Sequence, residues 1–188
     1  QIEEYYAQCE LEGANEHQVE ESQKAVAKME VIIGDPDRLR AVAEDFIKHY
    51  ETRVAEGATV AGKAMFVCSN RNIAYDFYKI VKELRPEWTE KKICDDGVVL
   101  SEKDKKELKP MEKIKLVMTR NKDDEKDLFD MLGTKEDRKE FDRQFKNPKS
   151  NFKIAIVVDM WLTGFDVPEL DTIYIDKPIQ QHTLIQTI

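Results

Sequence analysis

The sequence lacks the features that mark several large protein classes. Its 188 residues include only three cysteines, Cys9, Cys68 and Cys94, without a C-x-x-C pair. Neither a disulfide framework nor a zinc site is therefore indicated, and free buried thiols are expected. No apolar run approaches the roughly 18 residues that a membrane span needs, and the acidic first residues are unlike a secretory signal. We expect a soluble cytoplasmic protein that does not contact a membrane.

Common catalytic motifs and an excess of positive charge are also missing. The three histidines are scattered without H-E-x-x-H spacing, and no serine sits in a G-x-S-x-G turn. The chain has 38 acidic and 30 basic residues and a net charge of −8. Because nonspecific affinity for nucleic acid comes from neutralising phosphates, this balance argues against binding by charge alone. Any DNA contact must be local.

Hydrophobic patterning divides the chain into two parts, with a boundary near Val60. Residues 1–60 are typical of helices, one of which begins where Asp35 can accept hydrogen bonds from free amides and Pro36 suits a first turn. In residues 61–188, short apolar runs alternate with amphipathic helices. This alternation predicts an α/β fold with a mostly parallel sheet that helices cover on both faces, preceded by an α-helical lead-in.

Four segments are predicted to form the strands of this sheet: 63–68, 114–118, 154–158 and 172–175. The charged stretch 95–113 has few apolar residues, so we expect it to be a solvated surface loop. Ligands of parallel α/β sheets bind at the carboxyl ends of the strands. The residues that follow each strand are therefore the candidates for a functional site.

One motif that suggests a phosphate-binding loop is rejected on its context. Gly57 to Lys63 fits the pattern G-x-x-x-x-G-K. A phosphate loop follows a strand and opens a helix, and its next residue is a Ser or Thr that holds magnesium. Here the segment follows a helix and opens a strand, and Ala64 stands at the metal position. We interpret it as a linker.

A polar corner follows the first predicted strand. Ser69, Asn70 and Arg71 place a hydroxyl, an amide and a guanidinium beside the free amides of a helix start. Such groups can bind phosphate. Ordinary helix capping by Ser69 or Asn70, with Arg71 exposed, is the alternative.

A second candidate loop, which begins at Asp159, follows the third strand. Gly164 permits close approach of the backbone to a ligand, and Thr163 supplies a hydroxyl for a phosphate oxygen. Asp166 can accept hydrogen bonds from ribose hydroxyls or from basic groups. The alternative is a turn in which Asp166 caps the next element.

Together these segments resemble the second motor lobe of superfamily 2 helicases and translocases, and most closely that of the R subunit of type I restriction-modification enzymes. The segment 65–71 is similar to motif IV, and the third strand with Thr163–Asp166 is similar to motif V. Tyr174 to Pro178, followed by a helix that bears Gln186, is similar to the type I form. The resemblance implies a RecA-like lobe over residues 61–188, truncated within motif VI.

The resemblance also implies roles for single residues. Ser69 and Arg71 would touch the DNA backbone, and Thr163 and Gly164 would contact the tracked strand. Asp166 would face ATP across the cleft between two lobes.

Two further positions complete this comparison. Gln186 would open motif VI and belong to the nucleotide site. Val158 departs from the family pattern, because many members have a threonine there, so a phosphate contact from that side chain is lost.

The parent protein implied by the resemblance is a type I site-specific deoxyribonuclease and ATP-dependent DNA translocase. Its partners would be duplex DNA and the methyltransferase and specificity subunits. ATP and magnesium would be bound mainly by a first lobe that this chain lacks, and the arginines of motif VI would lie beyond its last residue. The chain by itself would thus hold no catalytic residue and no metal site, and would be inactive.

Two alternatives stay open at this point. One is the lobe of another superfamily 2 motor, such as an RNA helicase or a repair translocase. The other is a receiver-type α/β module with Asp159 as phosphoacceptor. A receiver needs acidic residues after its first strand to hold magnesium, and Cys68-Ser69-Asn70 offers none.

Overall fold

The computed structural model describes residues 16–161 and 167–178. Its sheet has four strands in the order β2-β3-β1-β4, and all three pairings are parallel. The strands are β1 (Lys63–Cys68), β2 (Ile114–Leu116), β3 (Ile154–Val157) and β4 (Leu170–Asp176). This arrangement confirms the predicted α/β fold with a parallel sheet and flanking helices, as in a RecA-like lobe.

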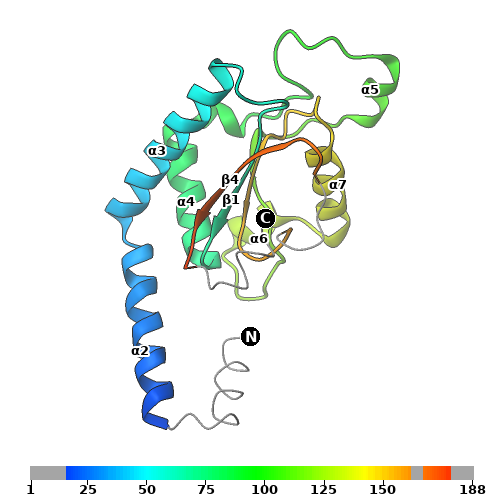
Figure 1. Ribbon diagram of the computed structural model, residues 1–188. Coiled ribbons are helices and arrows are strands. Elements are labelled where there is room, and N and C mark those ends of the chain that lie inside the picture. Colours follow the sequence, from blue (N-terminus) through cyan, green and yellow to red (C-terminus); the bar gives the residue numbers. More distant parts are fainter. Residues whose placement is uncertain (1–15, 162–166, 179–188) are drawn as a thin grey trace.

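Six α-helices and one 3-10 helix lie within the described residues (Figure 1). They are α2 (Glu16–Ile33), α3 (Pro36–Ala55), α4 (Arg71–Leu84), η1 (Pro86–Thr89), α5 (Glu102–Glu107), α6 (Lys126–Leu132) and α7 (Lys135–Lys146). None of them is long and apolar enough to cross a membrane. Residues 1–15, at the start of the predicted helical part, lie outside the described residues.

The helix starts follow from local sequence. At the start of α3, the Asp35 side chain accepts a hydrogen bond of 2.9 Å from the Arg38 amide, and Pro36 occupies the first turn. At the start of α4, Asn70 caps in the same way by accepting from the Ile73 amide. Both starts were predicted from the capping residues and are confirmed.

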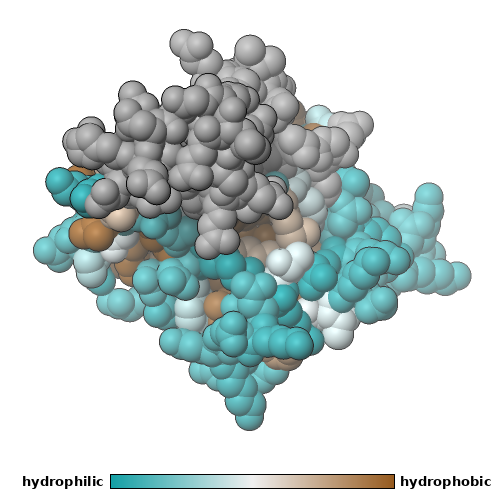
Figure 2. Space-filling view, turned by 90° about the horizontal axis from the view of Figure 1, so that it is seen from below, coloured by the Kyte–Doolittle hydropathy of each residue, from teal (hydrophilic) through white to brown (hydrophobic). Residues whose placement is uncertain are grey.

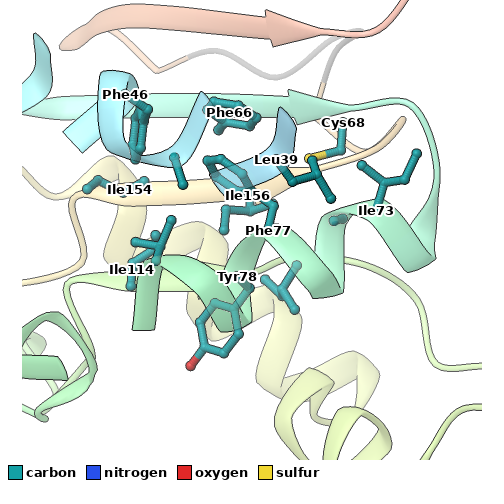
Figure 3. Packing of buried hydrophobic residues seen from close by; sticks show 14 of the residues in the cluster. Leu39, Phe46, Phe66, Cys68, Ile73, Phe77, Tyr78, Ile114, Ile154 and Ile156 are labelled. Atoms are coloured by element: carbon teal, nitrogen blue, oxygen red, sulfur yellow. The ribbon is translucent and has the colours of Figure 1, made fainter. Parts of the chain in front are cut away.

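One face of the sheet packs against α3 and α4 (Figure 3). Phe66 of β1 is stacked on Phe77 of α4 with 3.9 Å between ring centroids, and Phe46 of α3 meets Phe66 edge-on at 5.1 Å. Side chains alternate along a strand, so Met65 and Val67 point to the opposite face.

That second face forms a separate core. Phe145 of α7 and Phe152 lie fully buried against Met65 and Val67, with 4.9 Å between the two phenylalanine ring centroids. Both faces of the sheet are therefore covered, as the near-continuous apolar strands predicted.

Helix α3 belongs to the first of these cores. Leu39 and Phe46 are buried in it, and the Tyr50 hydroxyl donates to the Gly62 carbonyl at 2.8 Å. In contrast, α2 extends from α3 away from the sheet (Figure 1). The division of the chain into a helical lead-in, 1–60, and a lobe, 61–188, stays a prediction.

The stretch 95–113 is more structured than expected. It contains α5, whose start is fixed by a capping box between Ser101 and Asp104. Leu108 and Met111 are buried, and Met111 pairs with Lys92 in an isolated antiparallel bridge. Most of the stretch is exposed, as predicted, but it is not a simple loop, because two apolar side chains anchor this charged segment to the domain.

The cysteines are free where the structure describes them, but only one is fully buried. Cys68 is buried in the core, and burial raises the pKa of its thiol. Cys94 is half-buried, which corrects the expectation for that residue. Cys9 lies outside the described residues.

The segment from Gly57 to Lys63 is a linker, as its context predicted. It joins α3 to β1, and its two glycines have φ of 67° and 68°. Both carboxylate oxygens of Asp171 accept hydrogen bonds from its backbone amides, those of Val60, Ala61 and Lys63. A protein carboxylate therefore occupies amides that a phosphate loop would offer to its ligand.

Candidate functional site at the carboxyl edge of the sheet

The carboxyl ends of the parallel strands bring the candidate segments to one edge. Figure 2 views the molecule from below, the side toward which β1 and β4 point in Figure 1, and the described residues there are mostly hydrophilic. Ser69 and Arg71 follow β1 directly, and Asp159 lies shortly after β3. The sheet thus gathers the polar ends of separate strands, as predicted for this fold.

Four predicted site residues lie outside the described residues. They are Thr163, Gly164, Asp166 and Gln186. Their places at the edge stay predictions.

The corner after β1 combines a capping residue with a free hydroxyl. Asn70 uses its side-chain oxygen to cap α4. The Ser69 Oγ is shielded from solvent and has no hydrogen-bond partner within the described part of the chain. Capping thus occupies Asn70 but leaves the Ser69 hydroxyl uncommitted.

Arg71 is not simply exposed, as the capping alternative supposed. Its Nη2 donates to both oxygens of Asp124, at 2.6 and 2.7 Å, and its Nη1 donates to the Thr119 carbonyl at 2.6 Å. The Arg71 side chain is 26% exposed, whereas that of Asp124 is only 7% exposed. Arg71 therefore joins the start of α4 to the loop that follows β2.

Asp124 is also bonded by its own loop. The Asn121 backbone amide donates to it at 2.7 Å. Burial acts to raise the pKa of the Asp124 carboxyl, but the hydrogen bonds from Asn121 and Arg71 outweigh burial and hold the pKa below its usual value. The carboxylate is therefore the form that this loop stabilises.

A second bidentate ion pair closes the end of β4. The Arg38 guanidinium donates to both carboxylate oxygens of Asp176, with 3.1 Å from Nη1 to Oδ2. Nη1 also donates to the Ile33 carbonyl at 2.9 Å. The hydrogen bond to Asp176 raises the pKa of Arg38 above its ordinary value. One side chain thus fixes the end of α2, the start of α3 and the end of β4.

A weaker contact lies beyond β3. Lys177 Nζ is 3.2 Å from an oxygen of Asp159, whose side chain is 70% exposed. Among the residues that the structure describes, no group of three or more histidine, cysteine or acidic side chains is placed to hold a metal ion.

Sequence reasoning found Ser69 and Arg71 but missed the residues that hold them. Asp124 was overlooked, although an acidic pair in the polar segment after β2 must lie at the same edge as Arg71. Arg38 and Asp176 gave no local signal, because 138 positions separate them along the chain.

The fold and this edge define a class: a parallel α/β lobe of RecA-like type, with polar loops gathered where the strands end. The family model described as type I restriction enzyme subunit R domain 3 matches residues 60–188. The chain therefore belongs to this family. The match does not support the two alternatives, another superfamily 2 motor or a receiver-type module.

Curated relatives agree with the family model. The chain is 35% identical over 169 residues to the type I restriction enzyme HindI endonuclease subunit of Haemophilus influenzae, and the match covers 90% of this chain. It is 37% identical over 177 residues, 93% of this chain, to the putative type I restriction enzyme MjaIXP endonuclease subunit of Methanocaldococcus jannaschii. Each match spans only 14% of the length of the relative.

Proposed function

We propose that this chain forms the second motor lobe of the R subunit of a type I restriction endonuclease. In that protein, ATP hydrolysis moves duplex DNA past the enzyme before the DNA is cleaved. The observation that carries the proposal is the family match over residues 60–188, on a sheet whose carboxyl edge bears the motif IV corner. The predicted motif V and motif VI residues follow β3 and β4 in the sequence.

The residues of this edge divide between two ligands in the proposal. Ser69 contacts the DNA backbone together with Thr163 and Gly164. Asp166 and Gln186 face ATP. Arg71 lies at the same corner as Ser69.

The proposed motor works with two lobes. ATP and magnesium are bound mainly by the first lobe, elsewhere in the longer protein, and the described residues here hold no metal-binding cluster, so no step is assigned to magnesium on this chain. Catalysis needs groups held on both sides of a cleft, so the isolated chain should have no ATPase activity above background. Duplex DNA and the methyltransferase and specificity subunits are the proposed partners, and the cytoplasm is the proposed location.

The test is the ATPase activity of the full-length protein with and without duplex DNA. We expect DNA to stimulate turnover and Asp166→Ala to lower it about tenfold or more, which corresponds to roughly 1.4 kcal/mol of transition-state stabilisation. Asp96→Ala is the matched control, since its side chain is 96% exposed and lies far along the chain from the predicted site.

Three results would contradict the proposal. Stimulation by RNA in place of duplex DNA would favour an RNA helicase. Turnover that is indifferent to Asp166→Ala would remove the nucleotide role of motif V. Clear turnover by the isolated chain, abolished by the same substitution, would overturn the two-lobe mechanism.

A further inference from the structure

The partners of Arg71 do not fit a side chain that waits for a phosphate. Its Nη1 and Nη2 are bonded to the Thr119 carbonyl and to Asp124. When the Asn121 side-chain amide takes its hydrogen-bonding orientation, its oxygen also accepts from Arg71 Nε at 3.3 Å. Every nitrogen of the guanidinium is thus directed at the loop 119–124.

Burial makes this arrangement costly to undo. Asp124 is 7% exposed, and Arg71 is its only cationic partner among the described residues. If Arg71 turned toward a DNA phosphate, Asp124 would be left charged and buried without a counter-ion, a strongly unfavourable state. Protonation of Asp124 would not easily remove this buried charge, because the hydrogen bonds from Asn121 and Arg71 favour the carboxylate. The ion pair should therefore persist when DNA is bound.

The pair also spans two strand ends. Arg71 opens α4 directly after β1, whereas Thr119, Asn121 and Asp124 belong to the segment after β2. In the sheet order β2-β3-β1-β4, β3 lies between these two strands. The contact therefore reaches across the end of β3, the strand that leads toward the predicted motif V loop.

We propose that Arg71 is a positioning residue: through Asp124 it holds the loop 119–124 in place across the carboxyl edge, and it does not itself bind DNA. The proposal rests on the proposed function, since it assigns Arg71 a role within the same DNA-binding edge. Other groups of the edge bind the phosphates, and the ion pair keeps the loop that neighbours them in place.

The test is a double-mutant cycle in the full-length protein, with equilibrium binding to duplex DNA measured at several salt concentrations. We expect Arg71→Ala and Asp124→Ala each to weaken binding about tenfold, and the double variant to bind no worse than either single variant. The slope of log affinity against log salt should stay unchanged, because no phosphate contact is lost. Arg71→Lys should bind as weakly as Arg71→Ala, since an ammonium cannot reproduce the planar fork.

A direct phosphate contact predicts different results. Arg71→Ala would then reduce the salt slope by about 0.9, Arg71→Lys would retain much of the affinity, and Asp124→Ala would leave binding unchanged or strengthen it. Those results would overturn the proposal. So would DNA binding that is indifferent to both alanine variants.

Two controls keep the test decisive. Lys79 and Asp76 form an exposed ion pair at 2.7 Å on the same helix, and their alanine variants should leave DNA binding unchanged. Asp124→Asn keeps the shape of the side chain and replaces Asp124→Ala if that variant does not fold. If the unmodified protein shows no salt-dependent DNA binding, the proposed function fails rather than the role of Arg71.

Discussion

At the amino edge of the sheet, Lys63 and Asp171 bond to the backbone, whereas at the carboxyl edge Arg38 and Arg71 form bidentate ion pairs between separate elements. The Lys63 Nζ donates to the Phe152 carbonyl, and the Asp171 carboxylate accepts from three backbone amides. By contrast, Arg38 is paired with Asp176 and Arg71 with Asp124. Lys63 and Asp171 thus satisfy backbone groups at one edge, and the two ion pairs hold separate elements together at the other.

The basic residues of the two edges also differ in exposure. Lys63 is 1% exposed and lies 5.4 Å from the centroid of the Phe145 ring. The guanidinium groups of the carboxyl edge are partly exposed, 34% for Arg38 and 26% for Arg71. The buried Lys63 serves the fold alone, while the half-exposed arginines can shape a surface that faces a ligand. Substitutions at the amino edge should therefore change stability most.

The largest effect is expected from Lys63. Burial, with a smaller contribution from Lys153, lowers its pKa from 10.5 to about 6, and Asp95 and Glu169 offset only part of this. Between these two pKa values the unfolded chain binds a proton that the folded chain does not, so stability rises with pH. Between these pKa values, the free energy of unfolding of the unmodified protein, measured relative to that of Lys63→Met, should rise by up to about 1.4 kcal/mol per pH unit.

Urea unfolding of both proteins between pH 6 and 10.5 measures this difference. Lys63→Met should be the more stable protein at the acidic end, and the two curves should converge at the alkaline end. The control Lys103→Met replaces a lysine that is 81% exposed and should run parallel to the unmodified protein. Parallel curves for Lys63→Met would show that the folded protein holds this lysine charged and solvated.

The second effect concerns Asp171. Asp171→Ala leaves the amides of Val60, Ala61 and Lys63 without their acceptor and should lower the free energy of unfolding by about 1–3 kcal/mol. Asp171→Asn keeps one oxygen and should lose less. Thermal or urea unfolding gives the ranking, with Asp96→Ala expected within about 0.5 kcal/mol of the unmodified chain. Equal stabilities of all these variants would mean that water replaces the carboxylate at this edge.

The smallest effect is expected at the carboxyl edge. Arg38→Ala removes the bonds to Asp176 and to the Ile33 carbonyl, and partial exposure limits the loss to about 1 kcal/mol. Amide hydrogen exchange should accelerate around residue 33 more than in the core strands. Lys177→Ala breaks only a pair with an exposed Asp159 and should change neither measurement. A loss at Arg38 larger than at Asp171 would reverse the comparison between the two edges.

Much of the fold could be predicted because it depends on patterns of residues that are close together in the sequence. Apolar runs predicted the four strands to within two residues at each end, and Asp35 and Asn70 marked helix starts that the structure confirms. The structure within 95–113 was not predicted, since it depends on the burial of Leu108 and Met111 against other segments of the chain.

The candidate site was predictable in its location but not in its contacts. Ser69 and Arg71 were predicted as site residues because they follow β1 and the carboxyl ends of parallel strands share an edge. The partner of Arg71 could not be named, since Asp124 lies 53 positions away and competes with many other acidic residues. The roles of Thr163, Gly164, Asp166 and Gln186 stay predictions.

The sequence by itself determined the strand and helix alternation, the helix caps and the family resemblance, because each depends on residues close together in the chain. Only the tertiary structure decided the strand order, the burial of Lys63 and the pairing of Arg71 with Asp124. These depend on distant segments that meet when the sheet forms. Burial and ion pairing act over a few ångströms in space, whatever the separation along the chain, so the folded arrangement sets them.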